Sequence, residues 1–200
     1  TDLIKGHKTG FFLDHRENRH EVGKMSKGKT VLDVFSYSGG FTTHALVGGA
    51  TEVTSIDFSE QALALAEENV RLNPHAGKHN TIAGDAFEIL RRKIQEKKKY
   101  DIVILDPPSF ANSQDQIDIA KKKYAELADL GARLTNKGGV LLLASCSSRV
   151  NKEEFYELHE KQFERMRLSY KLLKTTEHAV DHPINFEEGA YLKSAYYKIR

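Results

Sequence analysis

The chain alternates between two patterns of hydrophobic and polar positions. Short apolar runs have the length of strands buried on both faces, and the longer segments between them repeat apolar residues at helical spacing. The predicted strands are 29–35, 51–57, 80–83, 101–105, 140–145, 170–174 and 191–199, and the predicted helices are 15–25, 41–47, 60–73, 86–95, 119–135 and 152–165. The predicted loops include 111–118 and 181–189, with a turn at 137–139. Strands that alternate with helices predict an α/β fold with a doubly wound, mostly parallel sheet.

The apolar run 101–105 ends abruptly in Asp106, followed by Pro107 and Pro108. Open α/β sheets bind their ligands at the carboxyl ends of the strands, so the acid lies where a ligand is expected. Two prolines cannot continue the ladder and hold the acid on a stiff turn. With Phe110 as an exposed aromatic neighbour, the turn suits the edge and face of a flat heterocycle. An ordinary strand-ending turn is the alternative for this motif alone.

Five polar residues follow predicted strands at positions that a doubly wound sheet would bring to one edge. They are Asp33, Asp57, Asp85, Asp106 and Cys146. One acid at a strand end is weak evidence, whereas five such positions predict a ligand site at this edge.

The first half of the chain has the features of a nucleoside site. The small-residue turn 36–40 leads from a strand into a helix and offers backbone N–H groups to a polar ligand. Asp57 can accept hydrogen bonds from a ribose diol, and Asp85 with Ala86 and Phe87 can frame an adenine. The dinucleotide glycine pattern and the phosphate-loop lysine are both missing, which favours S-adenosylmethionine. The candidate cofactor-binding residues are Asp33, Ser36, Tyr37, Ser38, Gly39, Gly40, Asp57, Phe58, Asp85, Ala86, Asp106 and Arg16.

Two further groups of basic residues have open interpretations. Arg16 and Arg19 lie either on a solvated helix start or on a lid over a ligand carboxylate or an RNA phosphate. The runs 91–93 and 97–99 are either a solvated face or a track for RNA phosphates.

Composition narrows the class of protein. The chain has 200 residues, of which 40% are hydrophobic, enough for one domain with a substantial core. The formal net charge of +2 permits a nucleic-acid partner without requiring one. The single cysteine rules out an internal disulfide and a cysteine-rich zinc site, so no metal is expected. No apolar run approaches the length of a membrane span and no signal peptide opens the chain, which predicts a cytoplasmic protein without a membrane partner.

Four segments resemble the successive motifs of class I S-adenosylmethionine-dependent methyltransferases. They are Val31-Leu-Asp-Val-Phe-Ser-Tyr-Ser-Gly-Gly40, Ile56-Asp-Phe-Ser59, Gly84-Asp-Ala-Phe87 and Asp106-Pro-Pro-Ser-Phe110. The resemblance implies a Rossmann-like fold with a seven-stranded, mostly parallel sheet and an antiparallel last strand. It also implies that 1–200 is one methyltransferase domain, with 1–25 as a lead-in segment.

Two more segments narrow the resemblance, namely 8–19 and the C-terminal motifs Asp181-His-Pro183 and Glu188-Gly-Ala-Tyr-Leu-Lys193. They resemble the catalytic domain of large-subunit ribosomal RNA cytosine-C5 methyltransferases of the RlmI type. That family carries an RNA-binding PUA domain and a linking domain before this region, and neither is present in this sequence. The chain begins with Thr1, so it is either a fragment or a homologue that recognises RNA differently.

The resemblance implies ribosomal RNA as the partner and assigns roles to named residues. Cys146 corresponds to the nucleophile that adds to C6 of cytosine, and Asp106 would hydrogen-bond the cytosine edge and supply a proton at N3. Pro107, Pro108, Phe110 and Arg19 are the candidate substrate-binding residues. The alternative for Cys146 is a small apolar residue at a strand end.

Three other functions remain open at this stage. The Asp-Pro-Pro-Ser-Phe turn also resembles that of methyltransferases that act on nitrogen, for example on guanine N7, for which Cys146 would be dispensable. A catalytically silent RNA-binding module that senses the cofactor is a second alternative, and a nicotinamide oxidoreductase is a distant third. The target nucleotide and the oligomeric state do not follow from the sequence.

Overall fold

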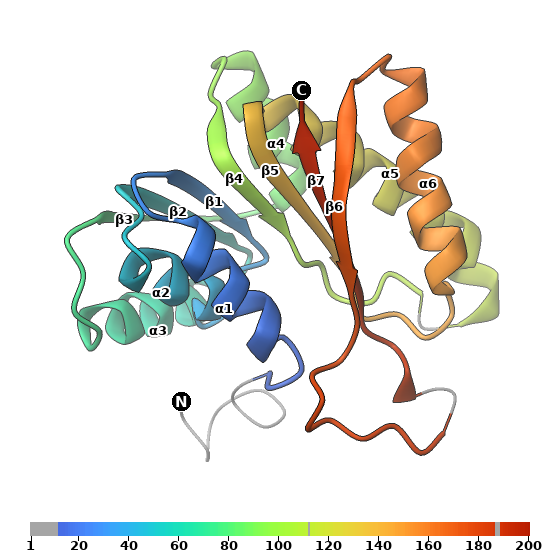
Figure 1. The fold of residues 1–200 in the computed structure, drawn as a ribbon, viewed down its shortest axis with the longest axis horizontal. Coiled ribbons are helices and arrows are strands. Elements are labelled where there is room, and N and C mark those ends of the chain that lie inside the picture. Colours follow the sequence, from blue (N-terminus) through green and yellow to red (C-terminus); the bar gives the residue numbers. More distant parts are fainter. Residues whose placement is uncertain (1–11, 112, 187–188) are drawn as a thin grey trace. The chain divides into compact units, whose positions relative to one another are not determined.

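A computed structural model describes residues 12–111, 113–186 and 189–200. The chain divides into two compact units, which are described separately (Figure 1). The first unit comprises the described residues up to Ala86 together with Ala179–His182, and the second comprises the described residues of 87–178 and 183–200.

The helices and strands follow the predicted order. The helices are α1 (Arg16–Met25), α2 (Gly40–Val47), α3 (Glu60–Arg71), α4 (Ala86–Gln95), α5 (Ile117–Leu134) and α6 (Lys152–Arg165). The strands are β1 (Thr30–Val34), β2 (Glu52–Asp57), β3 (Lys78–Ala83), β4 (Tyr100–Leu105), β5 (Thr135–Ser145), β6 (Tyr170–Thr176) and β7 (Lys193–Ile199). The seven strands have the order β3-β2-β1-β4-β5-β7-β6, and β7 is the antiparallel one. The α/β fold with a mostly parallel sheet is therefore confirmed.

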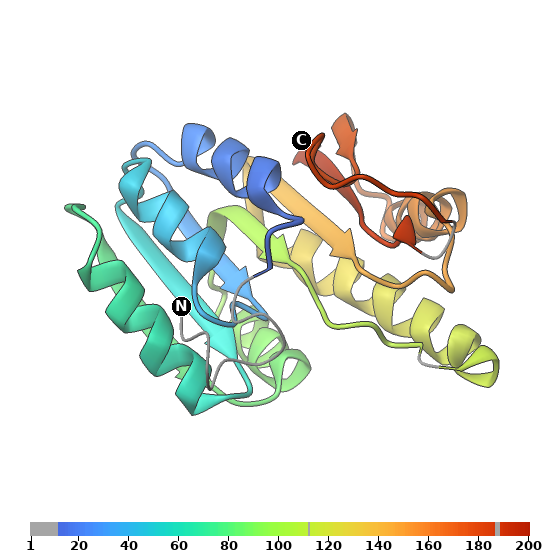
Figure 2. The same cartoon turned by 90° about the horizontal axis from the view of Figure 1, so that it is seen from below.

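In the first unit, β1, β2 and β3 are parallel, and Asp33 of β1 pairs with Ser55 of β2. Val31, Leu32 and Val34 are fully buried, as expected for an apolar strand between two layers. Helices α2 and α3 pack against these strands, and α1 packs against α2 (Figure 2).

The turn between β1 and α2 requires a glycine at position 39. Gly39 caps α2 with a φ of 76°, in the left-handed region that favours glycine. A Cβ at this position would lie 2.8 Å from the Cβ of Ala66 on α3, which is too close for two carbon atoms. The side-chain amide of Asn69, also on α3, donates to the carbonyl of Ser38 at 2.9 Å. Helix α3 therefore fixes the position of the turn.

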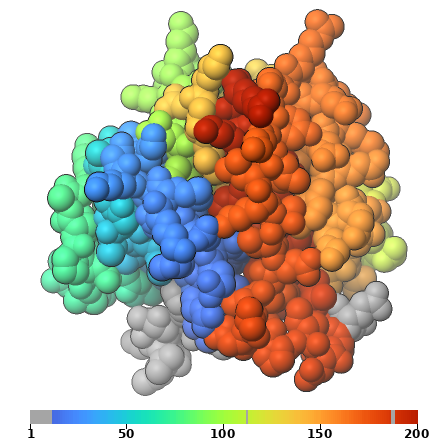
Figure 3. Space-filling model, viewed as in Figure 1, coloured from blue at the N-terminus to red at the C-terminus, as the bar shows by residue number. Residues whose placement is uncertain are grey.

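In the second unit, β4 and β5 are parallel, and β7 lies antiparallel between β5 and β6. Helix α5 packs on β4 and β5, and α6 packs on α5. Strand β6 is the exposed edge of this unit, and the orange segment that contains it lies at the surface in Figure 3. An aromatic cluster joins these elements through ring contacts among Tyr124, Phe155, His159, Phe163 and Tyr197.

Several boundaries differ by about two residues from the predictions, and the larger differences lie around 137–139 and 111–118. The segment 137–139 is not a turn that precedes a strand, because β5 already begins at Thr135 and the register with β4 shifts across it. Gly138 has a φ of 80° within this bulge, so glycines mark a bulge here as readily as a turn. The predicted loop 111–118 contains a 3-10 helix at Gln114–Gln116, and α5 begins at Ile117 rather than Ile119.

Candidate functional site

Asp33, at the end of β1, is tied to the first turn of α2. Its side chain is 1% exposed, and Oδ2 accepts hydrogen bonds from the backbone N–H of Thr42 at 3.0 Å and from its hydroxyl at 2.6 Å. The Thr42 hydroxyl lies 2.7 Å from that of Ser55 on β2, which lies 2.8 Å from Nε2 of His79 on β3. Burial lowers the pKa of His79. The buried carboxylate thus joins the helix start to a hydrogen-bonded row across all three strands.

Asp57, at the end of β2, is held by backbone donors on both carboxylate oxygens. Oδ2 accepts from the N–H of Tyr37 at 2.8 Å, and Oδ1 accepts from the N–H of Ser59 at 2.9 Å. Each carboxylate oxygen has two lone-pair sites, so one on each oxygen is left by these bonds for a further donor. The carboxylate is therefore oriented before any ligand arrives.

The turn that Asp57 clamps has an unusual backbone. Phe35 and Tyr37 have positive φ values of 63° and 46°, which non-glycine residues adopt at a cost. Ser36 and Ser38 are buried, whereas Phe58, after β2, is 82% exposed. Strained backbone at a strand end, beside an oriented carboxylate, is the arrangement found where a turn receives a ligand.

The remaining predicted residues of the first unit have different surroundings. Asp85 is exposed and Ala86, at the start of α4, is buried. Arg16 is exposed and forms ion pairs with Glu17 and Asp181, which raise the pKa of its guanidinium.

Arg19 does not lie on a solvated helix start. It is 4% exposed, and its Nη1 donates to the carbonyl of Phe12 at 2.6 Å. The ring of Phe12 in turn meets the ring of Tyr37 edge-on, with centroids 5.4 Å apart. Arg19 thus links α1 to the turn after β1.

In the second unit, the Asp-Pro-Pro turn after β4 lies beside the end of β5. Strands β4 and β5 are parallel, with Leu105 opposite Leu143, so the segments that follow them leave the sheet at the same edge. The Sγ of Cys146 is 3.8 Å from the carbonyl oxygen of Pro107. Pro107 is buried, Pro108 is exposed and Asp106 is half-buried. The structure thus brings together the two predicted catalytic segments, each with a partly accessible polar side chain.

Phe110 is not the exposed aromatic that the sequence predicts. Its ring is half-buried and packs 5.0 Å from the ring of Tyr124, with Phe87 at 6.2 Å. The ammonium of Lys123 lies 5.0 Å from the ring centroid. The rings that contact Phe110 come from helices α4 and α5, which the local sequence around the prolines does not reveal.

Two residues near Cys146 were not singled out as site residues from the sequence. Lys193, at the start of β7, is 3% exposed, and its ammonium donates to the carbonyls of Ser147 and Tyr191. Burial lowers its pKa to about 8, opposed by the charge of Cys146. Tyr124 is 2% exposed and its hydroxyl lies 2.9 Å from that of Ser145; burial raises its pKa to about 12. The sequence offers one indication of the role of Lys193, because a charged residue follows the apolar pair Tyr191-Leu192 at the start of the predicted last strand.

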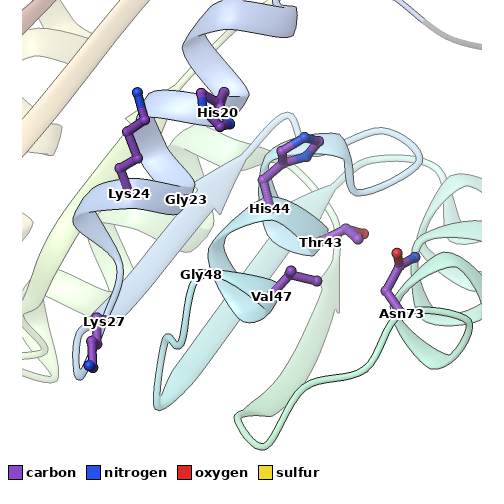
Figure 4. Close-up of a pocket in the computed structure, with 9 residues that line it drawn as sticks. All are labelled: His20, Gly23, Lys24, Lys27, Thr43, His44, Val47, Gly48 and Asn73. Carbon is purple, nitrogen blue, oxygen red and sulfur yellow. The ribbon is translucent and has the colours of Figure 1, made fainter.

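A cavity of about 460 Å³ lies elsewhere in the first unit, along α1 and α2 (Figure 4). It is lined by His20, Gly23, Lys24, Lys27, Thr43, His44, Val47, Gly48 and Asn73, none of which is a predicted site residue. Burial lowers the pKa of His44. Among the described residues, no helix has the length and apolar character to cross a membrane, and no cluster of acidic, histidine or cysteine side chains is arranged to bind a metal.

Comparison with known proteins gives consistent matches along the chain. A family model described as S-adenosylmethionine-dependent methyltransferase matches residues 1–194. The chain is 43% identical over 196 residues to a ribosomal RNA large subunit methyltransferase of Deinococcus radiodurans, covering 98% of this chain and 48% of the relative. It is 39% identical over 202 residues to ribosomal RNA large subunit methyltransferase I of Aeromonas salmonicida, covering 100% of this chain and 51% of the relative. The chain thus spans about half the length of these relatives.

Solved structures show the same fold. SMU.776 in complex with SAH superposes with a TM-score of 0.84 at 29% identity, covering 97% of this chain and 51% of that chain. Trm5b from Pyrococcus abyssi superposes with a TM-score of 0.71 at 20% identity, covering 100% and 52%. The match of the family model over nearly the whole length shows that the chain belongs to the S-adenosylmethionine-dependent methyltransferase family.

Proposed function

We propose that this chain is the catalytic part of an enzyme that methylates C5 of a cytosine in large-subunit ribosomal RNA through a covalent adduct with Cys146. The observation that carries the proposal is the contact between Cys146 and the Asp-Pro-Pro turn within one unit, at 3.8 Å from Pro107. Relatives named as ribosomal RNA large subunit methyltransferases support the substrate class. Because ribosomal RNA is modified where ribosomes are assembled, the proposal includes a cytoplasmic location.

The residues of the first unit fit the cofactor of this family. The turn 36–40 has a glycine that a side chain could not replace, and Asp57 retains lone-pair sites for a ribose diol. Asp33 fixes the start of α2 by accepting a hydrogen bond from the N–H of Thr42. Phe58 and Asp85 are exposed just after β2 and β3. We assign the turn and these residues, with Ala86, Arg16 and Asp106, to the cofactor. When bound, S-adenosylmethionine supplies an electrophilic methyl group on sulfur.

Cys146 provides what cytosine lacks, because C5 of the free base is a poor nucleophile. The thiolate adds to C6 and forms an S–C6 bond, while the electron pair of the C5–C6 double bond is shifted toward C5 and the ring. Asp106, acting as a proton donor at N3, stabilises the enamine that results. C5 would then take the methyl group, whose bond to the cofactor sulfur breaks. A base removes the C5 proton, the S–C6 bond breaks to restore the C5–C6 double bond and the thiolate, and the proton on N3 returns to Asp106. Pro107, Pro108 and Phe110 hold the turn on which Asp106 approaches the base, and Arg19 is assigned to the substrate side.

The test is transfer of labelled methyl groups from S-adenosylmethionine to ribosomal RNA from a strain that lacks the modification, followed by digestion to nucleosides. Wild type and Cys146→Ala are compared. We expect label in 5-methylcytidine with wild type and a loss of at least about a hundredfold with the variant, because the chemical step loses its nucleophile. Ser148→Ala, close to Cys146 in the chain and assigned no part in the chemistry, is the matched control.

The other outcomes separate the alternatives. Label in another nucleoside that does not depend on Cys146 would favour a nitrogen methyltransferase that uses the Asp-Pro-Pro turn. Cofactor binding with no transfer to any ribosomal RNA, by this chain and by the longer protein with its neighbouring domains, would favour a silent cofactor-sensing module. Either result contradicts the proposed reaction.

A further inference from the structure

Lys193 is a buried ammonium whose surroundings single it out in the second unit. Its side chain is 3% exposed, although a lysine is seldom buried so fully unless its charge is compensated. Two of its three N–H donors have backbone acceptors, the carbonyls of Ser147 and Tyr191. Carbonyl oxygens offset the loss of water but do not neutralise a charge. The site therefore favours an anion near the ammonium.

The sulfur of Cys146 is a candidate anion, because Lys193 pairs with Ser145 across β5 and β7 and its ammonium donates to the carbonyl of Ser147, the residues on either side of Cys146. Burial is the larger influence and lowers the pKa of Lys193, and the electrostatic interaction with Cys146 acts in the opposite direction and raises it. By reciprocity, an ammonium that gains from a thiolate also stabilises that thiolate.

Other ionisable side chains lie on the elements around Cys146 and Lys193. Tyr124, from α5, interacts electrostatically with both Cys146 and Asp106, the latter at the end of β4. The ring of His178 meets that of Tyr191 edge-on, with centroids 4.5 Å apart. Burial raises the pKa of Tyr124 to about 12, so Tyr124 is neutral near pH 8 and offers the sulfur no positive charge, whereas the ammonium of Lys193 does.

We propose that Lys193 is a positioning residue that holds Cys146 as a thiolate, ready to add to the base. The inference rests on the proposed function for its biological meaning, but the state of the thiol is a property of the free protein. The competing view is that Lys193 only satisfies the two carbonyls and stabilises the fold. That view predicts no change in the acidity of Cys146 when the ammonium is removed.

The single cysteine makes the test direct, because every thiol signal from the chain reports Cys146. The rate of alkylation by iodoacetamide is measured against pH for wild type, Lys193→Met and Lys193→Arg, without RNA or cofactor. We expect a midpoint below about 8.5 in wild type, the value for an ordinary thiol. Lys193→Met should raise the midpoint by about one pH unit and slow alkylation near neutral pH about tenfold, and Lys193→Arg should restore most of both because it keeps the charge.

Controls separate a change in acidity from a change in folding or access. Lys198→Met removes an exposed lysine from the same strand and should leave the midpoint unchanged. Ultraviolet absorbance of the thiolate, measured against Cys146→Ala, needs no entry of a reagent. Equal midpoints in wild type and Lys193→Met, with both folded by circular dichroism, would overturn the inference. A shifted midpoint in a protein that fails to methylate cytosine would instead leave the inference standing and contradict the proposed function.

Discussion

Some ionisable groups of the two units are held in different ways. In the first unit, Asp33 and Asp57 receive hydrogen bonds from backbone N–H groups, so the chain itself holds the carboxylates in place. In the second unit, Lys193, Tyr124 and His159 are buried among apolar and aromatic groups, and burial displaces their pKa values. The comparison therefore sets carboxylates that backbone donors orient in the first unit against side chains in the second unit whose pKa values are displaced by burial.

The largest expected effect tests the first half of that comparison at Asp33. Asp33→Ala removes the carboxylate that accepts hydrogen bonds from the N–H and the hydroxyl of Thr42. Because these buried donors then lose their acceptor, the variant should be less stable by about 3 kcal/mol. Urea unfolding measures the change. Asp33→Asn keeps one carbonyl acceptor at the same place and should lose about half as much. A loss below about 1 kcal/mol for the alanine variant would mean that the carboxylate does not organise the turn.

The next effect tests tuning by burial at His159, whose imidazole lies among Phe155, Phe163 and Tyr197. Burial lowers its pKa to about 3 from an ordinary 6.5. Below pH 6.5, His159 therefore binds a proton in the unfolded chain but stays neutral in the folded chain. The folded state thus loses stability relative to the unfolded state as the pH falls. Between about pH 7 and about pH 5 the loss from this group should be about 2 kcal/mol.

Denaturant titrations at both pH values measure that loss. His159→Gln, which retains a hydrogen-bonding side chain but cannot titrate, should show a smaller pH dependence by the same amount. If the wild type and the variant lose stability in parallel, the imidazole is not held neutral by the aromatic cluster.

The smallest effect concerns ligand binding at Asp57. Asp57→Asn keeps an oxygen for one backbone donor but removes the charge offered to a ribose diol, so affinity for S-adenosylhomocysteine should fall about tenfold, or about 1.4 kcal/mol. Isothermal titration calorimetry measures it, with Glu60→Gln, an exposed acid at the start of α3, as the control. Unchanged affinity would remove Asp57 from the cofactor site.

Local patterns were sufficient for most of the fold. The strands at 101–105 and 140–145 are apolar on both faces, and a run of that kind has few alternatives in an α/β chain. The adjacency of the Asp106 and Cys146 segments also followed, because it needs only two parallel strands in register.

What the sequence could not show depends on contacts between distant residues. The burial of Phe110 requires Tyr124 on α5, and the direction of Arg19 requires the carbonyl of Phe12. The position of Lys193 beside Cys146 requires β7 to insert next to β5, a topology that no single segment encodes. The glycine pair at 138–139 predicts a turn, whereas the structure has a shift in the register between β4 and β5. Both conformations use glycine because it tolerates a positive φ.

The contact between Gly39 and Ala66 sets a limit on how this family member can vary. Positions 39 and 66 are far apart in the sequence but face the same small space. The Cβ of Ala66 fills it and would lie 2.8 Å from a Cβ added at Gly39. A residue larger than alanine at position 66 on α3 would press on the turn between β1 and α2, although position 66 belongs to none of the motifs. The shape of the turn is therefore set partly by α3. Replacement of Gly39 is expected to remain unfavourable even with Ala66→Gly, because its φ of 76° favours glycine whatever the space around it.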